Sequence, residues 1–430
     1  MRNHRTSLEV AHTPIAAVIL AAGRSSRMGT SKPLLPLGPM TVIERLVDSV
    51  SRAGVDDIVV VTGHKADRLT PVLSGLPVRV AHNAGYDAGM FSSVRTGAAA
   101  LDDHTKAFFI LPADYPLVRS QVLNRLIEAS REEDCLLIHP TCCGLRGHPP
   151  LLSGRLREPL LKARNDDILR DFLQRRVSGS GVGITNNEVE LEVEVEDLTI
   201  LLDMDAPEDF QRIRRFAAAL DATAAKTTDE RQPVPATATV IATALDRADS
   251  FPVEDAEYLL QLVEAPDRVV RHCRAVAAVA ETLARALEPR PPSLDVDLVR
   301  TAGLLHDMAR KHPRHAVLAE RLLANLGFAR LGAVVGAHMV LPHEQIGLSQ
   351  ITEEQLVYLA DKLVADDELV GLEERKKRAL QKWHGDPTSP QALETIESRM
   401  RGAHLILTKL ETVLGRPLEE ILPRQPHPST

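Results

Sequence analysis

The chain has 430 residues, 44% hydrophobic and 26% charged, a length that predicts two or three globular domains rather than one core. A net charge of −8 and an aromatic content of 3% exclude an extended basic or stacking surface, so we expect no nucleic-acid partner. We expect no membrane span, no signal peptide and, with four cysteines in no zinc spacing, a cytoplasmic location.

Short apolar runs alternate with amphipathic stretches over residues 14–220. Strands are predicted at IAAVILA, DIVVVTG and AFFILPAD, and helices at TVIERLVDSVSRAG and VRSQVLNRLIEAS. This order predicts a Rossmann-like α/β domain with a mostly parallel sheet covered by helices. Ligands of such sheets collect at the carboxyl ends of the strands.

The pattern changes in the second half of the chain. Residues 221–250 are rich in Ala, Thr and Asp without a sustained apolar period, which predicts a linker. Beyond it, apolar residues recur at helical spacing with no convincing strand. We therefore expect an all-α domain over residues 251–423.

The loop after the first strand carries the clearest signal for chemistry. VILAAGRSSRMGTSKPLLPL, residues 18–37, runs from an apolar strand into a Gly/Ser loop with two arginines and a lysine. Such a loop offers backbone N–H groups and fixed cations to a polyphosphate. Gly23 permits close approach of the backbone, and we expect Arg27 and Lys32 to contact phosphate oxygens.

This loop resembles the signature of the nucleotidyltransferases that include molybdenum cofactor cytidylyl- and guanylyltransferases and sugar-phosphate nucleotidylyltransferases. Three further segments follow in the family's order, NAGYDAGMFSSVRTG, RGHPPLLS and LLDMDAPEDF, so the resemblance covers residues 14–216. It implies a Mg²⁺-dependent transfer of a nucleotidyl group to the phosphate of molybdopterin. LAAG at the loop start, where guanylyl relatives have LAGG, favours CTP.

Two alternatives to this function stay open. The acceptor is a sugar or alditol phosphate, or the domain is a non-catalytic cofactor chaperone that docks with a molybdenum hydroxylase. Pyrophosphate release from CTP separates an enzyme from a chaperone, and the acceptor requirement separates the two enzymes.

Candidate residues of this first site fall into three groups. Arg27, Lys32 and Asp114 are the expected catalytic residues. The expected nucleotide-binding residues are Leu20, Ala21, Ala22, Gly23, Arg24, Ser25, Lys32, Ser92 and Ser93. Asp114 follows a strand directly and either holds Mg²⁺ or caps a helix near Val118. Asp203 and Asp205 join it at the metal, or Asp205 caps the helix entered through Pro207.

A second constellation lies in the helical half. GLLHDMARKH places His306 and Asp307 side by side in the sequence at the end of an apolar helix. Further histidines and an aspartate occupy helical positions: His272, His315, His338 and Asp361. Imidazoles and carboxylates that converge from several helices are ligands for Mn²⁺, Fe²⁺, Zn²⁺ or a similar ion.

The order H, HD, H, H, D resembles the HD superfamily of metal-dependent phosphohydrolases over residues 266–366. The resemblance implies hydrolysis of a phosphate ester or nucleotide, with His315 and His338 holding a second ion. His343 replaces or supplements one of them. Lys311 either faces a substrate phosphate or lies on the surface, and the charges of EERKKRAL are expected on a solvated helix face.

Overall fold

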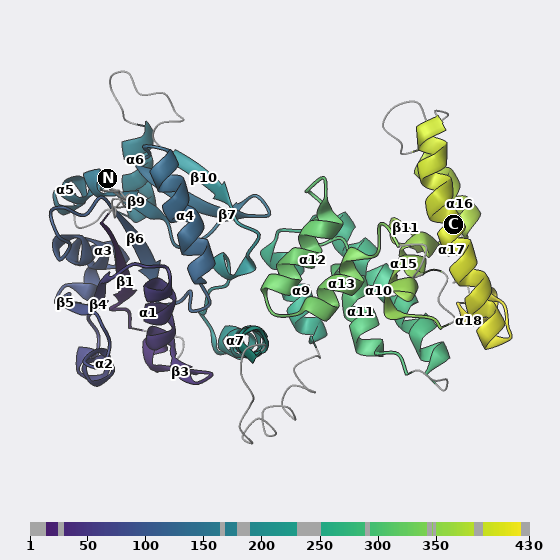
Figure 1. Cartoon of the computed structure of the whole chain (residues 1–430), viewed down its shortest axis with the longest axis horizontal. Coiled ribbons are helices and arrows are strands. Elements are labelled where there is room, and N and C mark those ends of the chain that lie inside the picture. Colours follow the sequence, from purple (N-terminus) through teal and green to yellow (C-terminus); the bar gives the residue numbers. More distant parts are fainter. Residues whose placement is uncertain are drawn as a thin grey trace, which may run out of the picture. The chain divides into compact units, whose positions relative to one another are not determined.

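The computed structural model describes residues 14–24, 30–163, 168–178, 190–229, 251–288, 293–341, 346, 350–381 and 390–422. The chain divides into two compact units, Met1–Ala217 and Ala218–Thr430 (Figure 1). The first is α/β and the second is helical, as predicted. Within the ranges described, none of the helices has the length and apolar character that crossing a bilayer requires.

One sheet forms the centre of the first unit. Its described strands run in the order β10-β7-β9-β6-β1-β4-β5, with β8 paired to β7. The pairs β1–β4, β1–β6, β4–β5 and β7–β10 are parallel, whereas β9 is antiparallel to β6 and β7. Their bounds are β1 Ile15–Ala21, β4 Asp57–Thr62, β5 Arg79–His82, β6 Ala107–Pro112, β7 Leu137–Cys142, β8 Leu145–Arg146, β9 Leu151–Ser153 and β10 Glu190–Glu194. A small hairpin, β2 Pro36–Leu37 with β3 Met40–Thr41, lies apart from this sheet.

Helices cover both faces of the sheet. A buried cluster joins alternate residues of β1, β4 and β6 to α3, α5 and α6, and α1 packs on β1 and α4 (Figure 1). Helix α1 begins with a capping box in which Thr41 and Glu44 satisfy each other's backbone N–H groups. The bounds are α1 Val42–Arg52, α2 Ala66–Leu73, α3 Met90–Ala99, α4 Ser120–Glu132, α5 Arg157–Leu161, α6 Leu169–Ser178 and α7 Pro207–Asp229, with 3₁₀ helices η1 Lys32–Leu34, η2 Tyr86–Ala88, η3 Gly154–Leu156 and η5 Leu198–Ile200.

The order of the strands creates a topological switch point beside β1. The chain passes from β1 to β4 and β5 on one side and then returns to β6 on the other. The carboxyl ends of β1 and β6 therefore lie together, and the Ala113 N–H donates to the Leu20 carbonyl at 3.1 Å. Crevices at such points are where open α/β sheets bind ligands.

Helix α7 continues to Asp229, into the first residues of the segment predicted as a linker. The segment DATAAKTTD is Ala-rich, and alanine has the highest helix propensity, so the helix extends where composition alone suggested a coil. Residues 230–250 lie outside the described residues.

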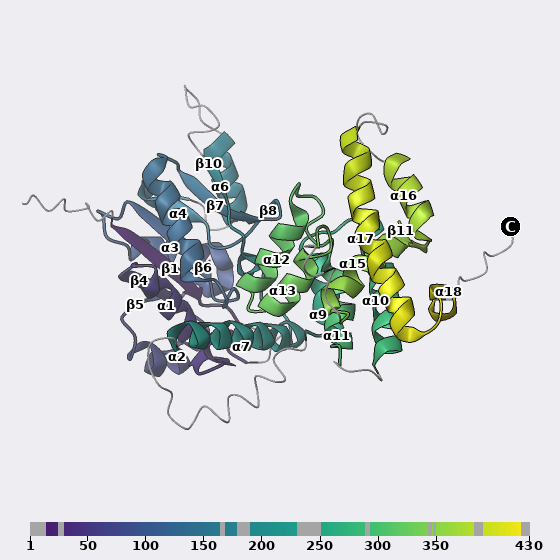
Figure 2. The same ribbon diagram turned by 45° about the vertical axis from the view of Figure 1, so that its right-hand side comes forward.

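The described residues of the second unit are helical apart from one small hairpin. Helices α10 and α11 pack closely, and α15 contacts both (Figure 2). The hairpin of β11 and β12 follows α15, and strands this short give no alternation for a sequence pattern to reveal. The bounds are α9 Val253–Leu262, α10 Asp267–Leu287, α11 Val296–Leu305, α12 His315–Asn325, α13 Ala329–Gly336, α15 Glu353–Leu363, β11 Val364–Ala365, β12 Glu368–Leu369, α16 Leu372–Gln381, α17 Pro390–Leu414 and α18 Leu418–Ile421.

Two candidate active sites

A pocket of about 310 Å³ opens at the switch point of the first unit. Backbone from Leu20 to Gly23 forms one wall, and Tyr86, Ser93, Lys32 and Asp114 also line it. The strand end, the loop lysine and the aspartate after β6 thus meet in one cavity, where the sequence placed them.

Lys32 reaches this pocket from η1 and pairs with Asp205. Its Nζ donates to Asp205 Oδ1 at 2.8 Å, and the lysine side chain is only 15% exposed. The N–H groups of Asp205 and Ala206 donate to Asp209 Oδ2 at 3.1 and 2.8 Å. Asp209 therefore holds the turn into α7, a role that sequence reasoning considered only for Asp205.

Asp114 presents an unpartnered carboxylate oxygen. Its Oδ1 is buried and makes no hydrogen bond within the described part of the chain. Burial raises the pKa of Asp114, Lys32 opposes that rise, and Asp205 and Asp203 add to it. Helix α4 begins at Ser120 after Arg119, so Asp114 is not its cap. An orphaned carboxylate beside two other carboxylates fits a hard divalent cation such as Mg²⁺.

The remaining nucleotide-binding candidates differ in their contacts and in whether they line the pocket. Arg24 forms an exposed ion pair with Asp87 at 2.8 Å. Ser92 donates to the Gly89 carbonyl at 2.7 Å, whereas Ser93 lines the pocket. Buried Asn83, which sequence reasoning missed, donates to both serine hydroxyls at 2.8 and 3.0 Å. Ser25 and Arg27 lie outside the described residues.

Ala22 lines this pocket and also belongs to the buried core cluster of the unit. A Cβ at Gly63 would lie 2.8 Å from the Cβ atoms of both Ala22 and Tyr86, so these backbones approach closely. The Ala22 carbonyl also accepts a hydrogen bond from the His64 N–H at 3.1 Å. The position that distinguishes LAAG from LAGG therefore lies among the residues that line the pocket, with its Cβ close to Gly63.

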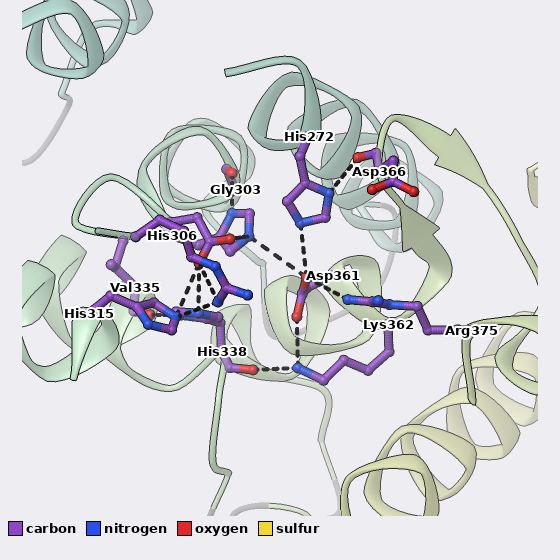
Figure 3. Close-up of polar contacts among 12 residues, drawn as sticks. His272, Gly303, His306, His315, Val335, His338, Asp361, Lys362, Asp366 and Arg375 are labelled. Carbon is purple, nitrogen blue, oxygen red and sulfur yellow. Dashed lines mark hydrogen bonds and ion pairs between the residues drawn. The ribbon is translucent and has the colours of Figure 1, made fainter. Parts of the chain in front are cut away.

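The second unit gathers all six histidines and aspartates that its sequence singled out (Figure 3). His272 Nε2 lies 3.2 Å from Asp361 Oδ1, and His306 Nε2 lies 3.7 Å from the same oxygen. His315 Nε2 and His338 Nε2 lie 3.2 and 3.6 Å from Asp307 Oδ1. The cluster divides into two groups with metal-ligand spacing that share Asp307: His272, His306 and Asp307, and Asp307, His315 and His338.

Backbone carbonyls orient three of these imidazoles. Nδ1 of His272, His306 and His338 contacts the carbonyl oxygens of Asp366, Gly303 and Val335 at 2.6, 2.8 and 2.7 Å (Figure 3). Each Nδ1 must therefore carry a proton, which leaves the Nε2 lone pair of neutral His306 and His338 facing the cluster, whereas His272 Nε2 lies within hydrogen-bond distance of Asp361. His306 Nε2, His338 Nε2 and Asp307 Oδ1 are buried without a hydrogen-bond partner among the described residues, which fits a bound metal ion.

The protonation states suit metal ligation. Burial lowers the pKa of His306 to about 4, against the opposing charge of Asp307, so the imidazole is neutral at neutral pH. Burial would raise the pKa of Asp307, but His306 and the other imidazoles hold it well below its ordinary value. The pKa of Asp361 is lowered in the same way, by Lys362 and His272 against the effect of burial. Both carboxylates are therefore ionised.

Three cations around the cluster were missed by sequence reasoning. Buried Lys362 donates to Asp361 Oδ2 at 2.8 Å and to the His338 carbonyl at 2.6 Å. Arg310 Nη1 lies 3.5 Å from Asp307 Oδ1. Arg375 lies 3.8 Å from Asp361 Oδ1, so it departs from the solvated face expected for most charges of EERKKRAL.

The structure does not place the two other candidates of the second unit, Lys311 and His343, in the metal cluster. Lys311 is exposed, and His343 lies outside the described residues. The sequence signals for the missed cations are adjacency to Asp361 for Lys362 and helical spacing from Asp307 for Arg310. Neither signal separates a site residue from an ordinary charge.

Both sites lie in segments that match known families. Residues 17–180 match the MobA-like NTP transferase domain, and residues 269–366 match the HD domain. The chain thus joins a nucleotidyltransferase-type α/β domain to a helical HD domain.

Individual relatives cover parts of the chain. "Bifunctional protein GlmU" of Francisella tularensis subsp. novicida is 33% identical over 126 residues, 28% of this chain and 26% of that protein. The chain therefore spans about a quarter of the length of the curated relatives it matches. The crystal structure of Rv0371c from Mycobacterium tuberculosis covers 47% of this chain and 97% of its own, at 26% identity and a TM-score of 0.38. A nucleotidyl transferase from Methanothermobacter covers 47% and 97%, at 27% identity and a TM-score of 0.39.

Proposed function

We propose that the first unit transfers a cytidylyl group from CTP to the terminal phosphate of molybdenum cofactor. The observation that carries this proposal is the unpartnered Asp114 carboxylate beside Lys32 in the pocket at the switch point. A phosphate oxygen of the acceptor forms a bond to the α-phosphorus of CTP, the bond to the β-phosphate oxygen breaks, and pyrophosphate leaves.

The residues of the pocket divide this work. Asp114, Asp203 and Asp205 would hold Mg²⁺, which when bound neutralises triphosphate charge. Lys32, 2.8 Å from Asp205, supplies a partly desolvated positive charge in the same pocket. Its electrostatic interaction with a phosphate is stronger there than in water. Backbone at Ala22 and Gly23 permits close approach of the nucleotide, and Ala22, where guanylyl relatives have Gly, is the residue proposed to favour CTP.

We propose that the second unit hydrolyses a phosphate ester with a divalent transition metal. The carrying observation is the set of buried, unpartnered imidazole and carboxylate atoms of His306, His338 and Asp307. A metal ion held there supplies an activated water and stabilises the leaving oxygen. His315 and His338, with Asp307, are the ligands proposed for a second ion.

The test of the transferase uses the purified full chain with each nucleoside triphosphate and molybdenum cofactor. We expect pyrophosphate release that needs both CTP and the cofactor, and a product whose mass is that of the cofactor plus one cytidylyl group. A kcat/KM for GTP equal to or above that for CTP would overturn the base assignment. Turnover with sugar phosphates only would support the alternative acceptor, and binding of the cofactor without pyrophosphate release would support the chaperone.

A further inference from the structure

Arg375 enters the metal cluster from a helix outside the segment that matches the HD domain. That match ends at residue 366, whereas Arg375 belongs to α16. Figure 3 shows its side chain directed at Asp361, and its terminal nitrogen lies 3.8 Å from Asp361 Oδ1. The arginine side chain is 21% exposed, so most of it is removed from water.

Arg375 has at least one donor without a hydrogen-bond partner among the described residues. Its Nε is buried and has no hydrogen-bond partner in the described ranges, and 3.8 Å is too long for a hydrogen bond to Asp361. Asp361 is already served by Lys362 at 2.8 Å and His272 at 3.2 Å. Burying a guanidinium whose donors are only partly satisfied is costly, so this placement indicates a function beyond the long ion pair with Asp361.

The balance of charge around the cluster indicates the kind of anion. Asp307 and Asp361 supply two negative charges, and Lys362, Arg310 and Arg375 supply three positive ones. A divalent metal held by the histidines would increase this excess. A dianionic phosphate group compensates such an excess better than the single charge of a phosphodiester.

We propose that Arg375 binds the phosphate group of the substrate and that the substrate class is a phosphomonoester. The inference rests on the hydrolase function proposed for this unit and extends it to a residue and a substrate class. The planar guanidinium offers parallel donors that match two oxygens of one phosphate. Arg310, half exposed and 3.0 Å from His315 Nε2, approaches from the turn between α11 and α12 as a second cation.

The experiment measures inorganic phosphate binding to the full chain loaded with Mn²⁺, by isothermal titration calorimetry. Arg375→Ala should bind phosphate about 10- to 100-fold more weakly than the parent, the loss expected for one charge-assisted contact. Its Mn²⁺ content should equal that of the parent. Arg375→Lys should recover part of the affinity. Dimethyl phosphate, with one charge, should bind the parent more weakly than phosphate.

Arg378→Ala is the matched control, because Arg378 lies on the same helix and pairs with Glu374 and Glu368 at 2.9 and 3.1 Å. It should bind phosphate like the parent. Equal phosphate affinity of parent and Arg375→Ala at equal Mn²⁺ content would overturn the role of Arg375 and leave the hydrolase intact. Loss of Mn²⁺ in Arg375→Ala would also overturn it, since the residue would then support the metal. A parent that binds no Mn²⁺ would overturn both proposals.

Discussion

Burial acts in opposite directions on the carboxylates of the two sites. Asp114 has a raised pKa because burial dominates and Lys32 compensates only in part. Asp361 is more deeply buried, yet its pKa is lowered because Lys362 and His272 outweigh burial. A bound cation would therefore favour the ionised form of Asp114 in the first site. In the second site, the neighbouring residues already keep Asp361 ionised.

Replacing Lys32 tests the cation of the first pocket. Lys32→Ala should lower kcat/KM for CTP by a factor that corresponds to about 2 to 4 kcal/mol of lost transition-state stabilisation. This is the scale for a desolvated contact to a phosphate. Steady-state kinetics with CTP measure the effect. Lys162→Ala is the control, since Lys162 is exposed and pairs only with Glu158 in the contacts described. Parent-like kinetics of Lys32→Ala would rule out its role.

Asp114→Asn keeps the shape of the side chain and removes its charge. Activity at saturating CTP should fall far more than the free energy of unfolding changes, because the lost group holds Mg²⁺. The raised pKa means that Asp114 takes up a proton at a higher pH than an ordinary aspartate. Apparent Mg²⁺ affinity of the parent should therefore weaken as the pH falls, and a Mg²⁺ titration at several pH values measures this. Native rates for Asp114→Asn across that titration would show that Asp114 binds no metal.

At the residue scale, the sequence predicts a site residue where both its type and its sequence neighbours are typical of a functional site. Lys32 and Asp114 follow predicted strands, and His306 and Asp307 stand in an HD pair, so their places could be predicted. Asn83 and Arg375 could not, because a polar residue before a helix and an arginine among other charges are common on surfaces. Only the fold brings Arg375 to Asp361.

Close packing of α10 and α11 sets the spacing of the metal ligands. A Cβ at Gly303 would lie 2.7 Å from the Ala277 Cα, so the two helices touch backbone to backbone. The Gly303 carbonyl also contacts Nδ1 of His306 at 2.8 Å. One glycine thus fixes both the distance between two helices and the orientation of an imidazole.

Gly303→Ala should therefore push α11 away from α10 and separate His306 from His272. We expect a loss of stability of about 1 to 3 kcal/mol from overpacking, together with lower metal occupancy. Denaturant unfolding and elemental analysis measure the two effects. Gly75→Ala, with its nearest neighbour at 3.6 Å, is the control. Full metal content at unchanged stability would contradict this account of the helix pair.

The loop around His148 should make the first unit sensitive to acid. His148 stacks on Tyr115 with ring centroids 4.3 Å apart, and burial lowers its pKa to about 4 from 6.5. Below pH 6.5 the unfolded chain binds this proton more readily than the folded chain, so stability falls as the pH drops toward 4. The full effect is about 3 kcal/mol.

His148→Gln should remove this part of the pH dependence. Urea unfolding at pH 7 and pH 5, followed by hydrogen exchange of peptides from β6 and β7, measures the stability of the unit. His312→Asn, an exposed histidine of the other unit, is the control. Identical pH slopes for parent and His148→Gln would show that His148 does not carry the effect.

On the scale of the whole molecule, the sequence predicts the two fold classes because their hydrophobic periods differ. Alternating strands and helices identify the sheet, and sustained helical spacing identifies the second unit. The boundary between them is predicted less well, since the Ala-rich end of α7 has composition typical of a linker and propensity typical of a helix. The β11–β12 hairpin is too short to produce a pattern.

The central claim is that the chain carries two chemically separate sites. Reciprocal variants test it most directly: Asp114→Asn and Asp361→Ala, each assayed for pyrophosphate release from CTP, phosphomonoester hydrolysis and bound metal. We predict that Asp114→Asn loses only pyrophosphate release. Asp361→Ala should lose bound transition metal and hydrolysis while it keeps pyrophosphate release. Unchanged metal content and hydrolysis in Asp361→Ala, or loss of CTP turnover in a folded Asp361→Ala chain, would contradict the claim.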